Sequence, residues 1–143
     1  MNHLLILLSV ILLAGIFVPA YAQTISDHVV INEVDTNPFG DDSQSISEWV
    51  ELYNPTDSEV DLSGWKIAST TVLQKTLTIP DGTIIGSDKL LKFTHEKIWF
   101  TDSSESVELR NSVNEVIDKT PFISDLENDF LSWQRSYDGH SNW

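Results

Sequence analysis

The chain has 143 residues, 22 Asp and Glu against 8 Lys and Arg, and a formal net charge of −14. The basic residues are scattered singly along the sequence, so this charge argues against binding to DNA, RNA or anionic lipid head groups. The chain contains no cysteine, which excludes a disulfide-stapled scaffold and leaves stability to a hydrophobic core.

The N-terminal segment is a separate unit. Leu4 to Val18 is apolar apart from Ser9, and small residues with A-x-A spacing follow at Ala20 and Ala22. This layout predicts a secretory signal peptide over residues 1–22, because the apolar run is shorter than the roughly 20 residues that span a bilayer. Retention as an uncleaved N-terminal membrane anchor helix is the alternative. Either outcome predicts an extracellular or cell-surface protein, with residues 23–27 as a short leader.

Beyond this leader, short apolar runs separated by turn residues predict an all-β domain, most simply a two-sheet sandwich. Several runs alternate between apolar and polar residues, as Leu77 and Ile79 do with Thr76 and Thr78. Ser124–Trp133 is the single segment with weak helical periodicity. The predicted strands are 28–34, 48–54, 64–68, 75–80, 89–93, 106–110, 115–122 and 131–135.

The acidic loop from Asp35 to Glu48 resembles an EF-hand at its first, third and sixth positions. The match then fails, because Phe39 occupies the fifth position and Ile46 the twelfth. An irregular Ca²⁺ site remains an alternative because calcium accepts oxygen ligands in flexible geometry. Its candidate ligands are Asp35, Asp41, Asp42 and Glu48. The other reading is a solvated loop.

Glu33 and Glu51 interrupt apolar strands, so both are expected to be partly buried. A pair of carboxylates can serve as acid and base in glycoside hydrolysis, which makes a small hydrolase a third hypothesis. The favoured interpretation is structural: we expect these carboxylates to face Arg135 in a partly buried ion pair. No nucleophile motif, Gly-rich phosphate loop or local zinc spacing supports catalysis.

The five tryptophans divide into two groups. Trp49, Trp65 and Trp133 lie inside predicted strands and are expected to pack in the core. Trp99 lies beside Phe100 in a loop-like stretch, so it is the first candidate for an exposed contact residue, and Phe39 in the acidic loop is the second.

The order of several segments resembles the lamin tail domain family. The match runs from "VVINEVDTNP" through "EWVELYNPTDSEVDLSGWKI", "IPDGTII", "KLLKF" and "SVELRNSVNEVIDKTPF" to "SWQRSYDGHSNW". It covers residues 28–143. Asn111 to Asn114 replaces the glycine-containing turn common in the family, which is tolerable because Asn can adopt left-handed backbone angles.

This resemblance implies an immunoglobulin-like β-sandwich of about 7–9 short strands in two antiparallel sheets. Trp49, Leu52 and Trp65 would then fill the sandwich, and Arg135 would belong to its closing strand. The resemblance also implies a non-enzymatic module that contacts a protein or a cell-envelope component. No cofactor is expected, apart from Ca²⁺ under the second hypothesis. The sequence predicts no nucleic-acid partner and leaves the oligomeric state open.

Overall fold

The computed structural model describes residues 24–41, 47–71, 73–95 and 98–143. The predicted signal peptide or anchor helix at residues 1–22 lies outside them. The described residues form ten strands. These are β1 (Val30–Asp35), β2 (Trp49–Asn54), β3 (Val60–Asp61), β4 (Lys66–Ser69), β5 (Thr76–Thr78), β6 (Ile84–Ile85), β7 (Lys89–Thr94), β8 (Val107–Arg110), β9 (Val116–Lys119) and β10 (Trp133–Gln134).

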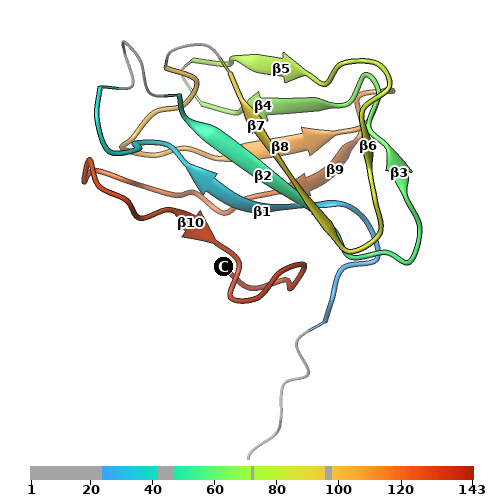
Figure 1. Ribbon diagram of the computed structural model, residues 1–143. Helices are drawn as coiled ribbons and strands as arrows, with labels where there is room; N and C mark the ends of the chain where they lie inside the picture. The colour runs from blue at the N-terminus through green and yellow to red at the C-terminus, as the bar shows by residue number, and fades with distance from the viewer. Residues whose placement is uncertain (1–23, 42–46, 72, 96–97) are drawn as a thin grey trace, which may run out of the picture.

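Two four-stranded antiparallel sheets face each other as an immunoglobulin-like sandwich (Figure 1). The first sheet has the order β10-β1-β2-β7 and the second β5-β4-β8-β9, while β3 and β6 form a separate pair. Eight of the strands overlap predicted ones; β3 and β6, with two residues each, were not predicted. The predicted all-β fold class is therefore confirmed. Within the described ranges, no helix has the length and hydropathy needed to cross a bilayer.

The core lies between the two sheets. In the first sheet, β1 and β2 place Ile31 opposite Leu52 and Val34 opposite Val50, and a bulge between Ile31 and Glu33 lets both β1 side chains face inward. The second sheet contributes apolar side chains from β4 and β8. The buried cluster includes Val29, Ile31, Val34, Val50, Leu52, Leu62, Ile67, Ile79, Ile85, Trp99, Phe100, Val107, Leu109 and Ile123.

The tryptophans do not all lie where the sequence predicts. Trp65 is half-buried and packs against the core. Trp49 is on the outer face of β2, because the strand turns Val50 and Leu52 inward, and the Lys92 ammonium lies 3.5 Å from its ring centroid. Trp133 is 37% exposed. The prediction that Trp49 and Trp133 fill the core is therefore wrong. Alternation along β2 turns Trp49 outward, whereas Trp133 lies opposite Val34 on β10, the edge strand of the first sheet, and stays partly in solvent.

Candidate functional site

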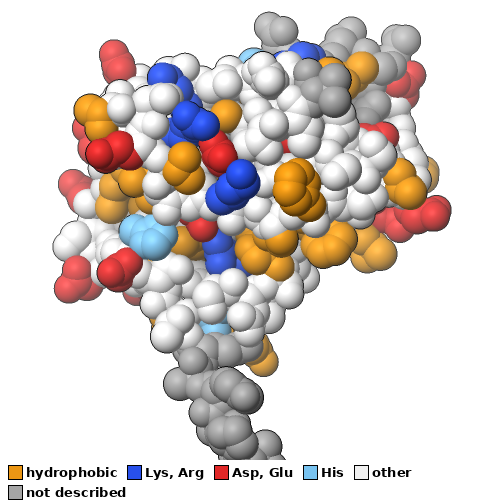
Figure 2. All heavy atoms as spheres, turned by 180° about the vertical axis from the view of Figure 1, so that it is seen from behind, with side chains coloured by type: hydrophobic (Ala, Val, Ile, Leu, Met, Phe, Trp, Pro, Cys, Tyr) orange, Lys and Arg blue, Asp and Glu red, His pale blue; other side chains and the backbone are white. Residues whose placement is uncertain are grey.

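Exposed apolar side chains gather where the segment before β10 meets the loop after β1. Phe130 is 84% exposed, Leu131 72%, Leu126 71%, Phe39 54% and Trp133 37%. We call these five residues the apolar patch. Figure 2 shows hydrophobic side chains gathered along one edge of the molecule, with acidic side chains beside them. Scattered single apolar residues are normal on a protein surface, but a group of this size marks a candidate interaction site.

The patch has two connected parts. The Phe39 and Phe130 rings are stacked, with their centroids 4.5 Å apart. Leu131, next in sequence to Phe130, lines a hollow of about 370 Å³ together with Leu126 and Trp133. The remaining lining residues are polar, namely Ser124, Asp125, Glu127, Asp129 and Ser132. An aromatic pair therefore lies beside a hollow with apolar and acidic walls.

Side-chain amides hold the two segments of the patch together. Asn128 donates to the carbonyl of Gly40 (2.7 Å) and accepts from its backbone N–H (2.7 Å). Asn37 donates to the carbonyl of Asp125 (3.1 Å), and the Trp133 indole N–H donates to the carbonyl of Ser124 (3.0 Å). These bonds take the place of regular secondary structure, and they define the backbone on which the patch is displayed.

The hollow is electrostatically negative. Asp125, Glu127 and Asp129 line it, and none of its lining residues is Lys or Arg. Burial raises the pKa of Asp125 above its ordinary value, and the negative charge of Asp129 raises it further. The weak helical periodicity of residues 124–133 does not produce a helix here, since this segment is irregular up to β10.

Of the two predicted contact residues, only Phe39 is on the surface. Trp99 is fully buried, with 0% of its surface exposed, and it stacks on Phe100 with ring centroids 4.5 Å apart. The prediction that Trp99 is exposed is therefore wrong. The cause is Glu48, whose carboxylate accepts the backbone N–H groups of Trp99 and Phe100 (2.6 Å for Phe100) and so draws both residues into the core.

Two of the predicted calcium ligands, Asp35 and Glu48, are buried. Glu48 is buried among backbone donors, and Asp35 is buried with its carboxylate accepting the Asn37 N–H at 3.1 Å. Asp41 is exposed, and Asp42 lies outside the described residues. In the part of the chain that the structure describes, no three His, Asp or Glu side chains form a group that could hold a metal ion. Calcium binding at this loop stays a prediction.

Glu33 and Glu51 face each other across β1 and β2, but they do not pair with Arg135. Glu33 accepts a hydrogen bond from the Ser132 hydroxyl. Burial raises the pKa of Glu51; an Asn32 hydrogen bond opposes this shift, and the charge of Glu33 adds to it. The predicted ion pair with Arg135 is therefore wrong, because the two glutamates project from the outer face of the first sheet.

Arg135 instead joins the two sheets at their edge. Its guanidinium donates to Asp118 on β9 (2.8 Å), to the carbonyl of Ile31 on β1 (2.7 Å) and to the carbonyl of His140 (2.5 Å). Asp118 also accepts the Ile31 N–H at 2.7 Å. These bonds compensate the burial of the ion pair, and they tie the residue after β10 to β1 in the first sheet and to β9 in the second. The sequence did not point to Asp118, since its β9 neighbours show no special pattern.

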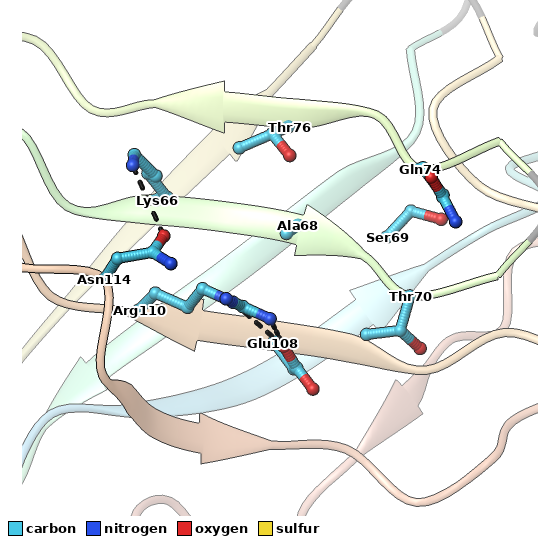
Figure 3. Close-up of a pocket in the computed structure, with 9 residues that line it drawn as sticks. All are labelled: Lys66, Ala68, Ser69, Thr70, Gln74, Thr76, Glu108, Arg110 and Asn114. Carbon is cyan, nitrogen blue, oxygen red and sulfur yellow. Dashed lines mark hydrogen bonds and ion pairs between the residues drawn. The ribbon is translucent and has the colours of Figure 1, made fainter.

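Another hollow, of about 450 Å³, lies on the outer side of the second sheet (Figure 3). Its only lining carboxylate, Glu108, accepts from Arg110 Nε (2.9 Å) and from Lys119 Nζ (3.0 Å). Partial burial alone would raise the pKa of Glu108, but the bonds from Lys119 and Arg110 outweigh it and hold the pKa below its ordinary value. Glu108 is thus held ionised, which suits an ion pair better than a general acid.

Comparison with known proteins identifies the sandwich. The family model of the Lamin Tail Domain matches residues 22–123. A search of curated proteins gave no match. The matched segment ends before Leu126, Phe130, Leu131 and Trp133, so most of the apolar patch lies beyond it. The match covers more than half of the chain. The chain therefore belongs to the lamin tail domain family.

Proposed function

We propose that this chain is an exported, non-enzymatic module that contacts a protein or a cell-envelope component through the apolar patch. The observation that carries the proposal is the exposure of the patch, above all the 84% exposure of Phe130. Burying such side chains against a partner removes apolar surface from water, at about 25 cal/mol per Å². The lamin tail domain family, made of non-catalytic immunoglobulin-like domains, supports the same role.

Export rests on the N-terminal sequence. The apolar run from Leu4 to Val18, followed by Ala20 and Ala22, is typical of a signal peptide, so the domain is expected outside the cell or on its surface. If the segment is not cleaved, it anchors the domain to the membrane. Fractionation of the native host, followed by N-terminal sequencing of the protein, separates these two outcomes. A mature chain beginning at Gln23 supports cleavage, and recovery of the full chain from the cytoplasm contradicts export.

Charge favours a protein partner over nucleic acid or anionic lipid. The net charge of −14 repels polyanions, and the carboxylates that line the hollow are located at the patch itself. The hydrolase hypothesis has less support, because Glu33 and Glu51 line neither of the two hollows described above. Binding of a partner to the patch requires no catalytic residue in this domain.

Photo-crosslinking tests the proposal in the native setting. A benzophenone amino acid replaces Phe130 in one variant, and in a matched control it replaces Val113, which is 72% exposed on the β8–β9 turn. Irradiation of intact host cells should give a discrete adduct from position 130 and none of the same mass from position 113. The adduct should disappear when Leu126→Ser and Leu131→Ser are added. Equal labelling from both positions, or none from either, contradicts the proposal.

A further inference from the structure

We propose that the apolar patch recognises a cationic, apolar segment of its partner protein. A Lys or Arg side chain would enter the hollow beside Asp125 and Asp129, and a neighbouring apolar side chain would pack on the Phe39–Phe130 stack. This inference rests on the proposed function and specifies the chemistry of the partner.

The lining of the hollow suits both the aliphatic stem and the charged head of a Lys or Arg side chain. Lys and Arg carry a long aliphatic stem below a charged head, so they bind best where apolar and acidic walls meet. Leu126, Leu131 and Trp133 supply the apolar wall, and Asp125, Glu127 and Asp129 supply the acidic one. The ring of Trp133 adds a face that attracts cations.

Charge decides between this occupant and the other candidates for an exposed apolar surface. Asp125, Glu127 and Asp129 line the hollow together, so their negative charges repel one another. Burial raises the pKa of Asp125, and the charges of Asp129 and Glu127 raise it further. A cation in the hollow relieves this repulsion, whereas an anionic lipid head group or an acidic peptide increases it. A second copy of this chain is disfavoured as well, because each copy carries a charge of −14.

The surface is also arranged before binding. The reciprocal bonds of Asn128 with Gly40, at 2.7 Å each, join the loop after β1 to the segment before β10. Asp129 accepts the Leu131 N–H at 2.7 Å, which holds the turn between Phe130 and the hollow. A pre-ordered surface loses less conformational entropy on binding, so a short peptide segment can be recognised.

Three short peptides test the inference on the purified full-length mature protein. Their common frame is Gly-Ser-Phe-X-Leu-X-Phe-Ser-Gly, with X as Lys, Glu or Ser, and binding is measured by titration calorimetry and amide chemical shifts. The Lys peptide should bind at least about tenfold more tightly than either of the others, and its affinity should fall as salt rises. The amide chemical-shift changes that the Lys peptide causes in the protein should map to residues 124–133.

Two variants locate the site. Asp125→Asn/Glu127→Gln/Asp129→Asn keeps the acceptor oxygens, including the one that Leu131 uses. It should lower affinity for the Lys peptide about tenfold without lowering the melting temperature of the protein. Phe130→Ser/Leu131→Ser should weaken all three peptides. Val113→Ser is the control and should change none of them. Thermal unfolding of each variant excludes loss of fold.

Three outcomes overturn the inference. These are equal affinity for the Lys and Glu peptides, no effect of the amide variant, or preferential binding to vesicles of anionic phospholipid. Failure here is distinguishable from failure of the proposed function. If crosslinking at position 130 gives an adduct but the peptides show no charge preference, only the partner chemistry is wrong. If crosslinking gives no adduct, the docking role itself is wrong.

Discussion

Of two irregular, aromatic-rich segments in this sandwich, one is buried and the other is exposed. The segment around Trp99 and Phe100 lies in the core, where these two side chains are at most 1% exposed. The segment around Phe130 places its aromatic ring in solvent, with 84% of its surface exposed. Both combine aromatic residues with acids and small polar residues. Aromatic content alone therefore does not distinguish a core loop from an interaction surface.

The two segments differ in the hydrogen-bond acceptors that their backbone N–H groups find. Glu48 takes the N–H groups of Trp99 and Phe100, and the buried Glu105 accepts the Thr101 N–H (3.2 Å) and the Ser69 hydroxyl (2.9 Å). Buried backbone N–H groups need hydrogen-bond acceptors, and these two buried carboxylates supply them for the loop that enters the core. The segment around Phe130 is held instead by amides at the surface, so its side chains stay outside.

The largest expected effect comes from removing the acceptor of the buried loop. Glu48→Ala leaves the N–H groups of Trp99 and Phe100 buried without their acceptor, which should lower the free energy of unfolding by roughly 3 kcal/mol. For a domain of this size the melting temperature should fall by roughly ten degrees. Urea unfolding measures the loss. Glu59→Ala removes an exposed carboxylate and is the control; an equally small change in both variants would show that Glu48 does not hold the loop.

A pH effect of intermediate size is expected where the first loop meets the patch. Burial raises the pKa of Asp35 to about 6; the Asn37 N–H opposes the shift, and the charge of Asp125 adds to it. Because the folded state then binds the proton more tightly than the unfolded chain, stability should fall as pH rises from about 4 through about 6. Asp35→Asn should flatten this slope and gain about 1–2 kcal/mol at pH 7, discounted for solvent screening.

Urea unfolding of both proteins between pH 4 and pH 7 checks this expectation. The raised pKa values of Glu51 and Asp125 contribute with the same sign, and the lowered pKa of Glu108 contributes with the opposite sign. The comparison therefore concerns the difference between the two proteins, not the slope of either one. A parallel pair of pH profiles would contradict the assignment to Asp35.

The exposed segment should tolerate the changes that the buried loop does not. Phe130→Ser/Leu131→Ser removes the ring stack with Phe39 and exposed apolar surface, so it should cost less than about 1 kcal/mol of stability. The same variant should weaken binding of all three peptides described above. Urea unfolding provides the first measurement. A loss as large as that of Glu48→Ala would mean that the patch is part of the fold rather than a docking surface.

The smallest effect is expected from calcium. Asp35 and Glu48 already accept backbone N–H groups, so a site drawing on them would have to displace those bonds. Millimolar calcium should raise the melting temperature by less than about 2 °C relative to chelator. A site occupied at a hundred times its dissociation constant would stabilise by about 2.7 kcal/mol, and such a rise, removed by Asp41→Asn/Asp42→Asn, would restore the calcium hypothesis.

Much of the sandwich was predictable because strand alternation and turn chemistry are local properties. Asn114 has a φ of 71° in the β8–β9 turn, the left-handed conformation expected of an asparagine there. The strand pair β3–β6 was not predicted, because strands of two residues are too short to show the alternation of apolar and polar residues. Alternation also fails to say which side of β2 faces inward when Trp49 and Leu52 are both apolar.

By itself, then, the sequence determined the fold class, the family, the acidic charge and eight of the ten strands that the described residues form. Tertiary structure alone decided that Arg135 pairs with Asp118, that Trp99 is buried, and that Phe130 stacks on Phe39 at the surface. The physical reason is distance along the chain. Alternation and turns act between near neighbours, whereas burial and ion pairing depend on segments brought together only when the sheets close.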